Sequence, residues 1–166
     1  MTTKYLIKNF YISSAFAILI FVLDRFSKVF VMKLDKMNYS PELYKSKFLN
    51  INLIWNEGIA FGLLSFNQNN LYNMLTLFIA VIVFIIFIMI VKNDNIKRYP
   101  LLMIFSGAIG NLYDRIMYKA VPDFIDFHIG DFHWFIFNVA DIFISLGVFS
   151  MILIELIDNN KKNETV

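Results

Sequence analysis

Two aspartates in apolar surroundings are the residues of this sequence best suited to acid–base chemistry. Asp123 stands in the run 121–127, after Val121-Pro122, and Asp141 stands 18 positions later in Asn138-Val139-Ala140-Asp141. A low dielectric disfavours the charged carboxylate and raises the pKa of Asp123. If the two side chains meet, they cannot both ionise and would share one proton. One could then take a proton from water while the other donates to a carbonyl oxygen.

Other polar residues recur at the spacing of one helix face. The three sets are Asn138, Asp141 and Ser145; Gly107, Asn111 and Asp114; and Asp24 and Lys28. Residues at i, i+3, i+4 and i+7 share a face, and these faces should look inward because lipid cannot satisfy them. We expect Asp24 to pair with Lys28, and Asp114 to pair with Arg115 at a helix end. The small residues Ser106, Gly107 and Gly110 predict close helix packing.

Competing chemistries have weaker signals. His128 and His133 could ligate a metal, but their spacing fits no strong motif and the chain has no cysteine. We therefore expect exposed or interfacial histidines, no metal and no cofactor. Ser27 and Lys28 are helix neighbours that point about 100° apart, which disfavours a Ser/Lys dyad. No Gly-x-Ser-x-Gly elbow is present.

The elements that carry these residues are too apolar for a soluble domain. The 166 residues are 58% hydrophobic and only 17% charged, with a net charge of +2 and a mean hydropathy of +0.62. This composition disfavours a soluble enzyme or a nucleic-acid partner and indicates a membrane protein. A hydrocarbon core of about 30 Å needs roughly 20 apolar residues in a helix. We expect one membrane domain with transmembrane helices over residues 10–32, 71–91, 99–117 and 134–154.

Basic residues predict the orientation of these four spans. Lys4 and Lys8 precede the first span, three cations fill the short segment 92–98, and Lys161 and Lys162 lie in a polar tail at 159–166. This density of positive charge predicts cytoplasmic N- and C-termini. Asp24, Asp114 and Asp141 then fall near the outer side of the membrane, with Asp141 roughly 10 Å in from Trp134. Each buried carboxylate costs about 2.5–3.5 kcal/mol at mid-helix, which marks it as a functional candidate.

The two outer connections, 33–70 and 118–133, predict a small β-sheet. Leu49, Ile51, Leu53 and Trp55 alternate with polar residues, as in a strand with one apolar face. Glycines follow in the segment 56–62, and Ile129-Gly130-Asp131-Phe132 could form a hairpin turn. The predicted fold is mainly α, with four transmembrane helices and a sheet and loop region on the outer membrane face.

Four motifs, in this order and spacing, resemble bacterial lipoprotein signal peptidase, also called signal peptidase II. They are Asp24-Arg25-Phe26-Ser27-Lys28, the segment 56–62 from Asn56 to Gly62, the segment 106–127 from Ser106 to Phe127, and Phe137-Asn138-Val139-Ala140-Asp141. The resemblance covers essentially the whole chain. It implies a metal-free intramembrane aspartic endopeptidase of the bacterial inner membrane, with its active site near the outer leaflet. The implied substrates are diacylglyceryl-modified prolipoproteins, cut just before the lipidated cysteine, and the implied inhibitor is globomycin.

The resemblance also implies roles for particular residues. Asp123 and Asp141 match the catalytic pair, and the matching positions that shape or support the site are Asp24, Lys28, Asn56, Gly58, Asn111, Asp114, Arg115, Asn138 and Ala140. The chain departs from the family pattern at Ser27, Ser106, Pro122 and Ile142. These departures leave the carboxylates intact, although Pro122 removes a backbone donor next to Asp123.

Two other classes of function stay open at this point. Intramembrane acids could serve a small ion- or proton-coupled transporter, or the polar faces could only pack helices in a membrane scaffold. A transporter should hold its acids near the bilayer midplane. The predicted clustering on one side disfavours it. A scaffold predicts that the Asp123→Asn and Asp141→Asn variants keep their biological function.

Overall fold

The computed structural model describes residues 3–37, 43–58, 69–93 and 95–163. These residues form helices and one small sheet, as the sequence predicts. In chain order the elements are α1 (Thr3–Met37), β1 (Tyr44–Lys45), β2 (Leu49–Asn56), α2 (Asn69–Lys92), α3 (Arg98–Tyr118), β3 (Val121–Ile129), β4 (Phe132–Phe137) and α4 (Val139–Asn163).

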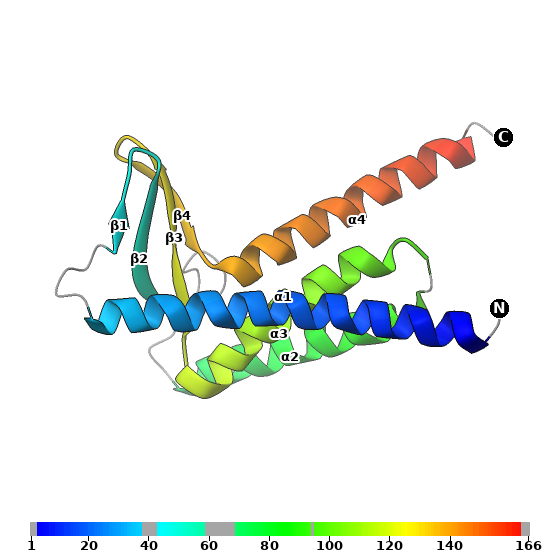
Figure 1. The fold of residues 1–166 in the computed structure, drawn as a ribbon, viewed down its shortest axis with the longest axis horizontal. Coiled ribbons are helices and arrows are strands. Elements are labelled where there is room, and N and C mark those ends of the chain that lie inside the picture. Colours follow the sequence, from blue (N-terminus) through cyan, green and yellow to red (C-terminus); the bar gives the residue numbers. More distant parts are fainter. Residues whose placement is uncertain (1–2, 38–42, 59–68, 94, 164–166) are drawn as a thin grey trace.

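The sheet lies at one end of the helices (Figure 1). Its strand order is β1-β2-β3-β4, and every neighbouring pair is antiparallel. The predicted strand from Leu49 to Trp55 is confirmed by β2. The predicted hairpin joins β3 to β4, with Gly130 at φ +60, a conformation that glycine adopts without strain. The start of α1 and the end of α4 lie at the end of the helices opposite the sheet (Figure 1).

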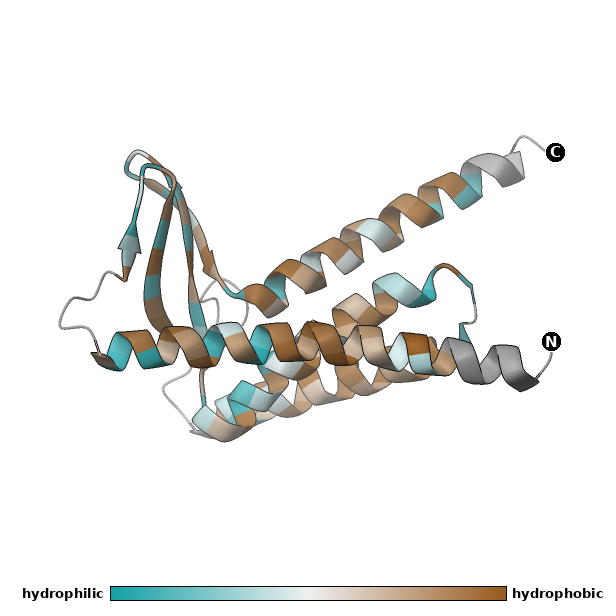
Figure 2. Cartoon of the chain, in the orientation of Figure 1, coloured by the Kyte–Doolittle hydropathy of each residue, from teal (hydrophilic) through white to brown (hydrophobic). Residues whose placement is uncertain are grey.

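The helices present large apolar side chains on their outer surfaces. On α2, Leu77 is 67% exposed and Phe84 is 62% exposed. Soluble proteins rarely expose many large apolar side chains side by side. Figure 2 shows apolar residues along α2 and α4, with more polar bands on α1 and α3 toward the sheet. By length and composition, two of the described helices can cross a membrane, at Asn70–Lys92 and Val139–Asn159. The exposed apolar surface and these two helices agree with the predicted membrane location.

Small residues allow α3 to pack closely against α1 and α4, as predicted for Gly107 and Gly110. A Cβ atom on Gly107 would lie 2.5 Å from the backbone oxygen of Ala140. A Cβ atom on Gly110 would lie 2.5 Å from Oδ2 of Asp24. Real Cβ atoms do not approach so closely, so both glycines are required for this helix spacing.

The predicted start of the fourth helix at Trp134 is wrong. Trp134 belongs to β4, and α4 begins at Val139. An apolar aromatic run suits a strand as well as a helix, and here pairing with β3 decides for the strand. At its other end α4 continues to Asn163, into the segment predicted as a polar tail. The glycine-containing segment after Gly58 lies outside the described residues.

Candidate active site

Asp123 and Asp141 line one cavity of about 580 Å³, where the sheet meets the helices. Five further polar residues line it. Four were predicted as site residues, Asn56, Asn111, Arg115 and Asn138, and the fifth is Ser145, which was predicted to share a helix face with Asn138 and Asp141. Most of the remaining lining is apolar, and it includes Ile79, Ile136, Phe137, Ile142, Ile144 and Leu146. A mainly apolar cavity with a few converging polar groups is typical of a ligand site.

The strand β3 places Asp123 in this cavity. The Asp123 carboxylate accepts hydrogen bonds from Asn56 Nδ2 at 2.9 Å and from Asn138 Nδ2 at 2.6 Å. Burial, together with the nearby charge of Asp141, raises the pKa of Asp123 to about 6. The two amide donors oppose this shift because they stabilise the ionised form.

Asp141 lies in the first turn of α4 and helps to begin that helix. Asn138 Oδ1 accepts from the Asp141 backbone N–H at 3.2 Å, and Asp141 Oδ2 accepts from the Asn138 backbone N–H at 3.1 Å. These reciprocal bonds form a capping box. The second oxygen of Asp141 accepts from Asn111 Nδ2 at 2.8 Å. Asn138 therefore hydrogen-bonds both carboxylates, and the helix N-terminus favours a negative charge at Asp141.

A buried ionic network behind the cavity joins α1 to α3. Lys28 Nζ lies 2.9 Å from Asp24 and 2.8 Å from Asp114, and it donates to Asn111 Oδ1 at 2.7 Å. Asp24, Lys28 and Asp114 are each 0% exposed. The predicted pair of Asp24 with Lys28 is confirmed. Asp24 also accepts from the backbone N–H of Ala140 at 3.1 Å, which ties α1 to the start of α4.

The predicted ion pair between Asp114 and Arg115 is wrong. Asp114 instead pairs with Lys28 and with Arg25, both on α1. Asp114 faces the cations of α1, whereas Arg115 lines the cavity, so the two side chains lie on different sides of α3. Arg115 Nη2 donates to the Gly58 carbonyl at 2.7 Å, while the buried Arg115 Nε has no hydrogen-bond partner among the described residues.

Gly58 continues this chain of contacts toward Asp123. Its backbone N–H donates to Asn56 Oδ1 at 2.9 Å, which orients the amide that bonds Asp123. Hydrogen bonds and ion pairs thus link every predicted site residue to another member of the set: Asp24, Lys28, Asn56, Gly58, Asn111, Asp114, Arg115, Asp123, Asn138, Ala140 and Asp141.

Sequence reasoning missed two features. Arg25 was not predicted as a site residue, although it pairs with Asp24 at 2.8 Å and also with Asp114. Its position directly after an intramembrane aspartate was the available signal. His128, predicted to be exposed or interfacial, is 8% exposed. Its ring stacks on that of His133, its partner across β3 and β4, at a centroid distance of 5.1 Å.

Comparisons with known proteins identify the family of this chain. A family model described as signal peptidase (SPase) II matches residues 16–157. The lipoprotein signal peptidase of Pelagibacter ubique is 52% identical over 156 residues, which cover 94% of each chain. That of Anaplasma phagocytophilum is 37% identical and covers 87% of this chain and 91% of its own. A solved bacterial membrane enzyme aligns with a TM-score of 0.70 at 29% identity, covering 90% of each chain. The chain belongs to the signal peptidase II family.

Proposed function

We propose that this protein is an aspartic endopeptidase that removes the signal peptide from diacylglyceryl-modified prolipoproteins, with Asp123 and Asp141 as its catalytic pair. One observation carries the proposal: two carboxylates from different elements line the same cavity and are bonded by the same residue, Asn138. Membership of the signal peptidase II family supports the substrate class.

The chemistry follows from one shared proton. The ionised carboxylate takes a proton from water, and the water oxygen attacks the scissile carbonyl carbon. The protonated carboxyl donates its proton to the carbonyl oxygen as the attacked carbon becomes tetrahedral. When the carbon–nitrogen bond breaks, the carboxyl that took the proton from water gives it to the leaving nitrogen, which becomes the amino group of the lipidated cysteine. The tetrahedral carbon's hydroxyl returns a proton to the other carboxylate, which restores the shared proton. Water is the nucleophile, so no covalent intermediate is required.

The cavity suits a lipid-modified substrate. Its apolar lining from α2, β4 and α4 can contact the signal peptide or the acyl chains, while the polar residues surround the scissile bond. Among the described strands, β4 is an edge of the sheet, and its Ile136 and Phe137 line the cavity. An extended substrate peptide could pair with β4. This pairing would expose the scissile carbonyl of the substrate to water.

The membrane arrangement is part of the proposal. All four helices cross the bacterial inner membrane, with both termini in the cytoplasm and the cavity near the outer leaflet. The polar residues of α1 and α3 pair with each other, which would offset the cost of placing them in lipid. Membrane lipid and globomycin are the other expected ligands, and no metal is required for the reaction.

Cleavage by the purified protein tests the proposal. In detergent or nanodiscs, the wild type should cut a diacylated prolipoprotein before the lipidated cysteine, and globomycin should block the cut. Asp123→Asn and Asp141→Asn should each reduce the cleavage rate by about 10³-fold or more. Either change leaves one carboxyl group, which cannot act as both the base and the acid.

Asp131→Asn is the matched control because it makes the same chemical change at the exposed hairpin turn. It should cut at the wild-type rate, and all variants should unfold at similar temperatures. An uncut substrate with the wild type, or an undiminished rate in either dyad variant, would overturn the mechanism.

A further inference from the structure

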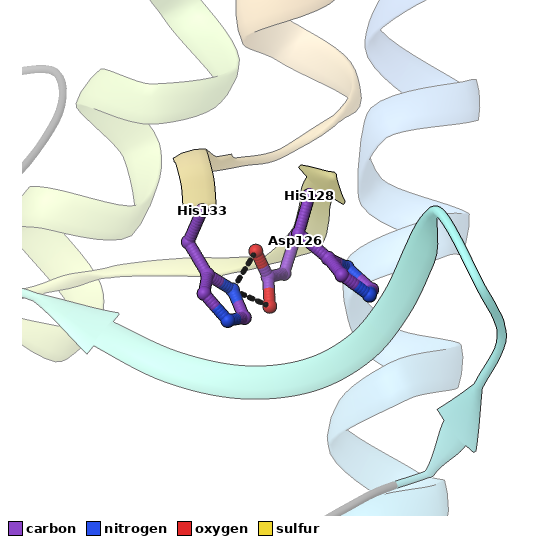
Figure 3. A group of neighbouring side chains, drawn as sticks. All are labelled: Asp126, His128 and His133. Carbon is purple, nitrogen blue, oxygen red and sulfur yellow. Dashed lines mark hydrogen bonds and ion pairs between the residues drawn. The ribbon is translucent and has the colours of Figure 1, made fainter. Parts of the chain in front are cut away.

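A second group of ionisable side chains lies on the hairpin of β3 and β4. Figure 3 shows Asp126, His128 and His133 together on these strands. His128 and His133 are direct partners across the two strands, and their rings stack with planes 20° apart. The Nδ1 atom of His133 lies 2.9 Å from each carboxylate oxygen of Asp126. A register shift between Asp126 and His128 accompanies this close approach.

This group is separate from the candidate active site. None of its three residues lines the cavity that contains Asp123. Asp126 follows Asp123 by three positions on β3, and side chains an odd number of positions apart point to opposite faces of a strand. Asp126 pairs with Asn50 of β2 instead, whose Nδ2 donates to its Oδ2 at 3.4 Å.

The ligating atoms of the three residues all lie within 4.8 Å of one another. Asp126 is 3% exposed and His128 is 8% exposed. The buried Nδ1 of His128 has no hydrogen-bond partner among the described residues. A buried polar atom without a hydrogen-bond partner destabilises the folded state. A cation bound to the imidazole of His128 would supply the missing partner. Asn50 supplies the hydrogen bond that commonly orients a ligating carboxylate.

We infer that Asp126, His128 and His133 bind one zinc ion. Two imidazoles and a carboxylate are a ligand set that zinc accepts, with water in the fourth position. Magnesium and calcium prefer oxygen ligands alone, so they fit this group poorly. Tetrahedral zinc sites place their ligand atoms roughly 3.3 Å apart. The His133 side chain is 53% exposed, so it has room to move its ligand atom closer to those of Asp126 and His128.

The zinc ion would tie together the two strands that lead into the candidate active site. β3 carries Asp123, and β4 runs into Asn138 and Asp141. The zinc ion would stabilise this hairpin and take no part in catalysis, because none of its three ligands lines the cavity. Zinc should therefore raise the unfolding temperature, while a chelator should change the cleavage rate by less than about twofold.

Zinc titration of the full-length protein tests the site. The chain has two histidines and no cysteine, so a histidine-free affinity tag leaves this group as its only source of imidazole. The wild type should bind one zinc per chain, and Co²⁺ should give the visible absorption bands of a tetrahedral complex. His133→Phe and Asp126→Asn should each weaken zinc binding by about tenfold or more. Asp131→Asn, at the turn of the same hairpin, should bind as the wild type does.

His133→Phe is the decisive variant because its side chain is half exposed and its loss should leave the fold intact. Circular dichroism confirms that each variant is folded. Absence of saturable zinc binding by the wild type at millimolar zinc would overturn the inference. So would His133→Phe protein that binds zinc with unchanged stoichiometry and affinity, because the ion would then lie elsewhere.

Discussion

Asn138 donates a hydrogen bond to each candidate catalytic carboxylate. Its side-chain nitrogen donates to Asp123 and its backbone N–H donates to Asp141, while its side-chain oxygen accepts from the Asp141 backbone N–H. Asp123 has a pKa of about 6 because burial outweighs the stabilisation that Asn56 and Asn138 give to its charged form. The carboxyl therefore keeps its proton to a higher pH than an ordinary aspartate does.

This balance predicts the direction of a pH shift. As the pH rises through about 6, the carboxyl pair of the free enzyme loses its shared proton, so kcat/KM should fall. Asn56→Leu removes a hydrogen bond to the ionised form and raises the pKa of Asp123. The falling limb of the kcat/KM profile should then move to higher pH by about one unit.

Asn52→Leu is the matched control, because it makes the same change on the same strand without a hydrogen bond to Asp123. Its profile should follow the wild type. A limb that stays in place or moves to lower pH in Asn56→Leu would contradict the assigned role of Asn56.

At the scale of elements, α1 and α3 are joined by two cations and two anions. Lys28 and Arg25 face Asp24 and Asp114, so the four formal charges cancel. Lys28 also orients the Asn111 amide, which bonds Asp141. The network thus sets the spacing of the helices and the position of one candidate catalytic carboxylate.

Removing the central cation should strongly destabilise the protein. Lys28→Met leaves two buried carboxylates with Arg25 alone, and breaking a buried pair in this way costs about 3–5 kcal/mol. Thermal unfolding in detergent measures the loss. The double variant Lys28→Met with Asp114→Asn should recover part of it, because the charges balance again.

Lys97→Met is the control for this substitution. Lys97 pairs with Glu155 and Asp158 at an exposed position, and exposed pairs contribute little to stability. An unfolding temperature of Lys28→Met close to that of Lys97→Met would contradict the structural role of the buried network.

The helices and strands followed from sequence more reliably than their contacts did. The alternation in β2 and the turn at Gly130 are local signals, and both predictions are confirmed. The start of α4 was misplaced because the apolar run before it suits either a helix or a strand. The pattern Asn138-x-x-Asp141 was a local sign of the true start. The Arg25 pairing and the stacked histidines depend on contacts between separate elements, which residue spacing alone does not reveal.

For the whole molecule, the sheet lies at one end of the helices (Figure 1). The cavity is lined by residues of that sheet and of the helices, and the ionic network bonds Asn111 in its lining. α1 has 35 residues, and at about 1.5 Å per residue it is longer than a hydrocarbon core of about 30 Å. This length allows α1 to extend beyond the bilayer toward the sheet.

The proposed topology predicts which segments face each side of the membrane. The chain has no cysteine, so each introduced thiol reports one position. In intact spheroplasts, Asp131→Cys should react with a membrane-impermeant maleimide, and Asn95→Cys should react only after permeabilisation. The reverse pattern would invert the topology. Labelling of both positions from outside would contradict a single membrane span, α3, between them.

The pairing of Lys28 has a consequence for biogenesis. α1 emerges from the ribosome first, and Asp114, one of the two carboxylates that pair with Lys28, follows 86 residues later. During that interval Asp24, one turn away on the same helix, is the counter-ion available to Lys28. Arg25 and Lys28 together exceed that single negative charge. Before α3 is synthesised, this part of α1 lacks the second anion that balances Arg25 and Lys28. We therefore expect stable insertion of α1 to be completed only when α3 arrives.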